Sequence, residues 1–179
     1  MFREVPVLPL VVPLAAAVFL ALLWHLRRRG MLSAPRAAVA FALCFYVAGV
    51  VANTVFPIYL DMPSRSGSPW HSSLYLEPFE NYEVADAVMN IVVFVPVGMI
   101  VPLLLARTSW WRVVAVAAAL SLTIEATQLL TARLLGGGHV ADVNDLMFNV
   151  LGGLLGYVLF EVLSRVPGLG VALDRFRWR

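Results

Sequence analysis

The sequence predicts an all-α protein, a polytopic transmembrane bundle of about five helices. Of its 179 residues, 61% are hydrophobic and only 13% are charged, and the mean hydropathy is +0.85. A soluble domain is nearer half apolar and a quarter charged. The apolar residues also come in long runs instead of alternating with polar residues, and a run of about 18 residues or more can cross the hydrocarbon core of a bilayer.

Five such runs follow one another along the chain. Each is 19 to 22 residues long, which corresponds to a helix of roughly 30 Å. The predicted spans are residues 5–26, 37–58, 85–106, 113–132 and 145–163. We expect the first two, within residues 1–60, to act mainly as anchors. Residues 61–84 are expected to form an extracytoplasmic loop, residues 85–164 a three-helix core, and residues 165–179 a basic cytoplasmic tail.

The placement of arginine predicts the orientation, because the cytoplasmic segments of membrane proteins are enriched in basic residues. The chain has 13 basic residues, all of them arginine. If the N-terminus lies outside, only Arg3, Arg65 and Arg133 fall in outer segments and the other ten fall inside. We therefore expect an N-out, C-in topology.

Polar side chains inside the last three runs indicate a functional site, because ionisable groups at membrane depth are costly. Lipid cannot satisfy such groups, so helices that carry them at one depth should turn them toward one another. We therefore expect a polar chamber between these three spans, open to the outer face. Its candidate residues are Asp86, Asn90, Glu125, Gln128, Asp142, Asn144, Asp145 and Asn149, with Arg133 and His139 placed in the outer loop to close it and to neutralise part of its charge.

Glycine and proline positions indicate how these spans meet. Gly152 and Gly156, with Gly153 beside them, have the small-xxx-small spacing that allows close approach of two membrane helices. Pro96 and Gly98 fall in the middle of the third span. Because proline removes a backbone hydrogen bond to the preceding turn, we expect a bend at Pro96.

The motifs, in their order and spacing, resemble those of the VanZ-like membrane proteins over about residues 76–160. The resemblance is carried by Leu76-Glu77-Pro78-Phe79, by Asn90, Phe94, Pro96 and Gly98, by Ile124-Glu125-Ala126-Thr127-Gln128, by the segment from Ala141 to Asn149, and by Gly152, Gly153 and Gly156. Two positions depart from the pattern. His139 stands where many relatives have an arginine, and Asn144 replaces a carboxylate.

The resemblance implies a multi-pass protein of the bacterial cytoplasmic membrane with a role in the cell envelope. The family's founding member is associated with low-level resistance to the glycopeptide antibiotic teicoplanin, and the resemblance implies a possible link to antibiotic resistance here. It implies no particular reaction. The site therefore has to be interpreted from its own residues.

Four functional hypotheses stay open at this point. We favour a binding protein whose chamber holds a membrane lipid, a lipid-linked envelope precursor or a partner helix. The alternative is an intramembrane enzyme in which Glu125, Asp142 and Asp145 act as acid and base or hold a divalent cation. A small transporter and purely structural polar packing are the other two. We expect no cofactor and no nucleic-acid partner, since the sequence has neither a histidine-rich metal motif nor interleaved basic and aromatic residues.

Overall fold

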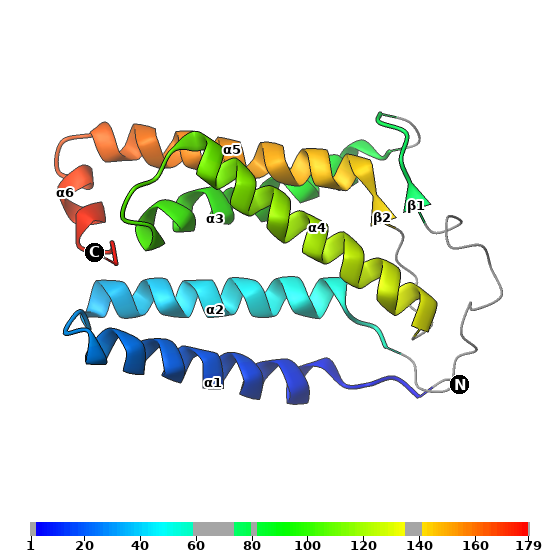
Figure 1. Cartoon of the computed structure of the whole chain (residues 1–179), viewed down its shortest axis with the longest axis horizontal. Helices are drawn as coiled ribbons and strands as arrows, with labels where there is room; N and C mark the ends of the chain where they lie inside the picture. The colour runs from blue at the N-terminus through cyan, green and yellow to red at the C-terminus, as the bar shows by residue number, and fades with distance from the viewer. Residues whose placement is uncertain (1–2, 59–73, 80–81, 135–140, 179) are drawn as a thin grey trace.

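In the part of the chain that the structure describes, five long helices and one short helix form a bundle. The computed structural model describes residues 3–58, 74–79, 82–134 and 141–178 (Figure 1). Its helices are α1 (Val7–Arg28), α2 (Ala34–Thr54), α3 (Val84–Leu104), α4 (Trp110–Leu134), α5 (Val143–Arg165) and α6 (Leu169–Asp174). The first five are long and apolar enough to cross a membrane. The predicted all-α bundle of about five spans is therefore confirmed.

Proline residues explain why α2 is shifted from its predicted range. The helix begins three residues early, at Ala34, because Pro35 in its first turn needs no backbone hydrogen-bond partner there. It ends at Thr54, and Pro57 follows after a cis peptide bond with Phe56. The apolar run continues beyond Thr54, but proline lacks the N–H that a further helical turn would use.

The long helices alternate in direction, so the two termini lie at opposite ends of the bundle (Figure 1). One end, here called the β end, holds the N-terminus and a two-stranded parallel sheet of β1 (Leu74–Tyr75) and β2 (Ala141–Asp142). The opposite end holds α6 and is called the α6 end. In Figure 1, α1 and α2 form one antiparallel pair, and α3, α4 and α5 form a second group beside α2.

Helices α3 and α5 approach so closely that only glycine fits between them. A Cβ atom added at Gly98 would overlap the carbonyl oxygen of Gly153, and one added at Gly156 would overlap the carbonyl oxygen of Val95. Phe94, Val97 and Val101 of α3 form a buried apolar core with two residues of α4. Helix α3 continues across Pro96 and Pro102 without interruption. The three helices of the expected core thus form one tightly packed unit.

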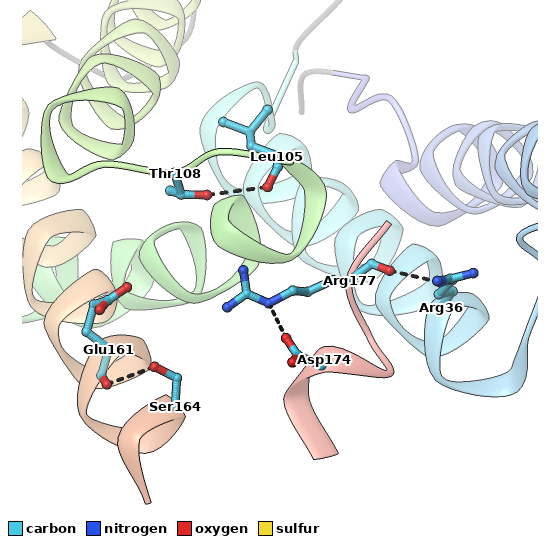
Figure 2. A network of polar contacts seen from close by, with 7 residues as sticks. All are labelled: Arg36, Leu105, Thr108, Glu161, Ser164, Asp174 and Arg177. Atoms are coloured by element: carbon cyan, nitrogen blue, oxygen red, sulfur yellow. Dashed lines mark hydrogen bonds and ion pairs between the residues drawn. The ribbon is translucent and has the colours of Figure 1, made fainter. Parts of the chain in front are cut away.

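The C-terminal segment folds back against the α6 end of the bundle, which the sequence analysis did not predict. After α5 the chain turns at Gly168, whose φ of 85° suits glycine. Beyond α6, the carbonyl oxygen of Arg177 accepts a hydrogen bond from Nε of Arg36 at 2.8 Å, and Nε of Arg177 lies 2.9 Å from Oδ1 of Asp174 (Figure 2). The N–H of Trp178 donates to the carbonyl oxygen of Leu103 at 2.8 Å. These contacts join α2, α3 and the C-terminus.

Candidate functional site

Glu125 of α4 lies at the β end, where its carboxylate meets the start of α5. The side chain is 8% exposed, and its Oε2 accepts a hydrogen bond of 2.9 Å from the backbone N–H of Asp142. Asp142 is in β2, whose pairing with β1 places this N–H beside α4. The carboxylate is therefore held in one position.

The N-terminus of α5 is capped by Asp142 and covered by the segment before α3. Oδ1 of Asp142 accepts from both the backbone N–H of Asn144 at 2.8 Å and its side-chain amide at 3.0 Å. Oδ1 of Asn144 accepts in turn from the backbone N–H of Phe79 at 2.7 Å. Phe79 has a φ of 63°, a left-handed conformation uncommon for a residue with a side chain. The backbone of Phe79 thus lies against the start of α5.

Two further pairs join α5 to its neighbours. The amide of Asn90, in α3, donates to Oδ1 of Asp145. One helical turn away from Asp145, the amide of Asn149 donates to Oγ of Ser121, in α4, at 2.9 Å. Asn149 and Ser121 are both buried. The pairing of Asn149 with Ser121 cannot be predicted from the sequence, because the register of α4 against α5 depends on tertiary packing.

A cavity of about 700 Å³ lies beside this polar cluster, and α2 forms one of its walls. Five predicted site residues line it, namely Asn90, Glu125, Gln128, Asp145 and Asn149. Helix α2 adds Ala42, Phe45, Tyr46, Gly49, Val50, Asn53 and Thr54. The cavity therefore lies between α2 and the three-helix core, whereas we expected a chamber within the core and gave α2 an anchoring role. Asn53 and Thr54, polar residues at the end of an apolar run, were the signal for this.

Some polar atoms along the cavity have no partner among the described residues. Oε1 of Gln128, Oδ1 of Asn149 and the hydroxyl of Tyr46 are buried without a hydrogen bond. All three residues line the cavity. Buried polar groups are nearly always hydrogen-bonded in proteins, so three such atoms at one cavity point to a missing polar partner.

The remaining predicted site residues lie outside the cavity or outside the described part of the chain. Asp86 is exposed in the first turn of α3. Asp142 and Asn144 organise the helix end but do not line the cavity. His139 and the side chain of Arg133 lie outside the described residues. In the described part of the chain, no three His, Cys, Asp or Glu side chains are placed to hold a metal ion together.

These features define a class: a membrane protein of five spans in which a polar cluster borders a cavity between helices. The chain belongs to the VanZ/LLP1 family, whose model matches residues 41–164. The resemblance is thus confirmed, and the match extends beyond the predicted 76–160 to include most of α2, the wall of the cavity. No curated protein and no solved structure matches the chain.

Proposed function

We propose that this protein binds a membrane amphiphile in the cavity between α2 and the three-helix core. The observation that carries the proposal is the cavity itself, which is apolar along most of its walls and polar at the β end. Its volume of about 700 Å³ falls in the range of ordinary ligand sites. An amphiphile matches this division, with its headgroup at the polar cluster and its chain along the apolar wall.

The length of the cavity supports the same proposal. Along α2 its lining runs from Thr54 at the β end to Ala42, twelve residues further into the helix. At about 1.5 Å per residue this is roughly 18 Å, more than half the thickness of the hydrocarbon core. On α3 the lining reaches Ile100, sixteen residues after the first residue of that helix. An acyl or prenyl chain would fill such a volume.

Exposed side chains at the rim of the cavity support entry from the bilayer. Phe45 of α2 is 73% exposed and Met89 of α3 is 60% exposed, and both line the cavity. Their outer surfaces would face lipid, so a ligand would enter sideways between α2 and α3. Such a route suits a molecule that is already dissolved in the membrane.

The arginine distribution supports an orientation for the site. Of the arginines in the described part of the chain, all but Arg3 and Arg133 belong to the α6 end. Under the positive-inside bias we expect this end to be cytoplasmic, and the polar cluster would then face the outer side of a bacterial cytoplasmic membrane. We therefore propose a ligand of the outer leaflet, such as a lipid or a lipid-linked envelope precursor.

A cavity-filling variant tests the proposal. Gly49 lines the cavity, and a Cβ atom added there would meet nothing within 4 Å, so Gly49→Phe fills space without a clash at the backbone. Ala38→Phe places the same side chain on an exposed position of α2 outside the cavity and is the matched control. Native mass spectrometry should find lipid bound to the wild type and to the control, but depleted in Gly49→Phe. Equal lipid in all three would contradict the proposal.

An intramembrane acid/base enzyme is the second candidate, favoured by the fixed and buried carboxylate of Glu125 at the cavity. A positioned carboxyl group transfers protons efficiently when it reaches the reacting group. Purified protein incubated with an envelope lipid extract would then form a new lipid product, and Glu125→Gln would not. If wild-type protein forms none, this candidate fails while the binding proposal stands.

The link to teicoplanin resistance implied by the family stays a prediction. Expression of the wild-type protein in a susceptible host would raise the teicoplanin concentration that inhibits growth, and Gly49→Phe would not. If the inhibitory concentration stays the same when the protein is fully expressed, the protein does not contribute to teicoplanin resistance.

A further inference from the structure

We propose that the headgroup recognised at the polar end of the cavity is rich in hydrogen-bond donors and carries no anionic group. The inference rests on the proposed amphiphile binding and names the chemical class of its ligand. Two lipid sources share this chemistry, namely the hydroxyl groups of a glycolipid and the ammonium group of an amine-bearing lipid. Anionic phospholipids with a bare phosphate do not share it.

The first argument is the charge of the lining. Glu125 and Asp145 bring two carboxylates to the cavity, and no Arg, Lys or His is among the described residues that line it. An anionic headgroup placed there would face two carboxyl groups with no cation beside it to neutralise its charge. A hydroxyl or ammonium group would instead donate hydrogen bonds to the carboxyl oxygens.

The second argument concerns the side-chain donors of the lining that already have acceptors within the protein. Four polar residues of the lining donate to acceptors of the protein itself. Asn53 donates to the carbonyl of Gly49 and Thr54 to that of Val50, while Asn90 donates to Asp145 and Asn149 to Ser121. Thr54 thereby uses its one O–H donor, and each of the three amides uses one of its two N–H donors.

Two amide oxygens of the lining, in contrast, accept no hydrogen bond from the described residues. Oδ1 of Asn149 and Oε1 of Gln128 are buried without a partner, and the Asn149 side chain as a whole is only 4% exposed. A buried carbonyl oxygen is satisfied by a donor, and a fully ionised phosphate or carboxylate group has none to offer. The hydroxyl of Tyr46, on the opposite wall, is also buried without a partner. The two unpartnered amide oxygens thus require N–H or O–H groups of a ligand, and the Tyr46 hydroxyl can accept from such a group as well as donate.

Three probe lipids with identical dioleoyl chains test the inference on the wild-type protein. They are a monoglucosyl dioleoylglycerol, an analogue with a primary ammonium headgroup, and dioleoyl phosphatidic acid. Each is added in the same amount to phosphatidylcholine nanodiscs that contain the full chain, and native mass spectrometry measures how much of each the protein retains. We expect the glucosyl or the ammonium lipid to be retained at least about ten-fold over phosphatidic acid. Whichever of the two is retained more strongly identifies the source.

The outcomes separate this inference from the proposal beneath it. If phosphatidic acid is retained as well as the other two, and Gly49→Phe displaces all three, the cavity binds lipid but the headgroup class is wrong. If Gly49→Phe displaces none of them while Ala38→Phe behaves like the wild type, the cavity does not bind lipid and both ideas fail. A preference for the donor-rich lipids that Gly49→Phe abolishes supports both.

Discussion

The backbone N–H of Asp142 donates to Oε2 of Glu125 across 2.9 Å, and this contact joins α4 to the start of α5. Because the same carboxylate lines the cavity, one residue holds the fold together and shapes the candidate site. Asp142 itself caps α5 through its own side chain. At the β end, Asp142 thus organises the start of α5, whereas Glu125 both holds that helix start and faces the cavity.

Substitutions of Glu125 should separate its acceptor role from its charge. Glu125→Gln keeps a side-chain oxygen for the N–H of Asp142 and should retain most of the stability. Glu125→Leu leaves that N–H without its partner, which should cost about 1–3 kcal/mol. Thermal unfolding of the purified proteins checks that Glu125→Leu is the less stable of the two.

Glu161→Leu is the control, because it removes a carboxylate whose 3.7 Å ion pair with Arg165 is exposed. This control should melt close to the wild type. A Glu125→Leu protein that melts like the control would contradict the account.

Alanine substitutions along α5 should show that the contact with α3 admits only glycine. In Gly156→Ala, the new methyl group would overlap the backbone of Val95, and overpacking of this kind costs about 1–3 kcal/mol. Gly49→Ala is the matched control, because the space around that position is open and alanine favours the helical conformation. We expect a lower unfolding temperature for Gly156→Ala and an unchanged or higher one for Gly49→Ala. Equal unfolding temperatures would show that α3 and α5 can separate at little cost.

Removal of the C-terminal segment should loosen the α6 end. A chain that ends at Asp174 loses the hydrogen bonds made by the carbonyl of Arg177 and the N–H of Trp178. At about 0.5–1.5 kcal/mol each, this amounts to roughly 1–3 kcal/mol. Hydrogen exchange should then be faster around Arg36 and at the end of α3. A chain shortened by Arg179 alone serves as the control and should exchange like the full protein. Unchanged exchange in the shorter chain would exclude a stabilising role for the segment.

Cysteine labelling tests the proposed orientation. The single native cysteine, Cys44, is buried in α2, and Cys44→Ala gives a background without thiols. On that background, a membrane-impermeant reagent added to intact cells should label Ser66→Cys but not Thr108→Cys. Permeabilised cells should show labelling of both. The reverse pattern in intact cells would place the polar cluster on the cytoplasmic side.

The sequence predicts the spans well because length and hydropathy alone determine which segments can cross a bilayer. It also identifies the five polar residues of the core that line the cavity, since such residues inside apolar runs are costly. The wall formed by α2 could not be predicted in the same way. Which face of α2 meets the core depends on tertiary packing, and Tyr46 and Gly49 carry no separate signal.

Two further features depend on contacts between distant parts of the chain. The pairing of Leu74 with Ala141 joins segments that are two helices apart, and two-residue strands are too short to give an alternating pattern. Helix α6 has only six residues, and its position depends on the contacts that Arg177 and Trp178 make with other helices. Neither contact is encoded by a local motif.

The central claim is that the cavity between α2 and the three-helix core holds a membrane amphiphile. A density map of the wild-type protein in nanodiscs made from native lipids tests it most directly. We predict elongated non-protein density that begins beside Gln128 and Asn149 and continues along α2 toward Ala42. A map in which α2 lies directly against α3 and α4, with no density between them, would contradict the claim.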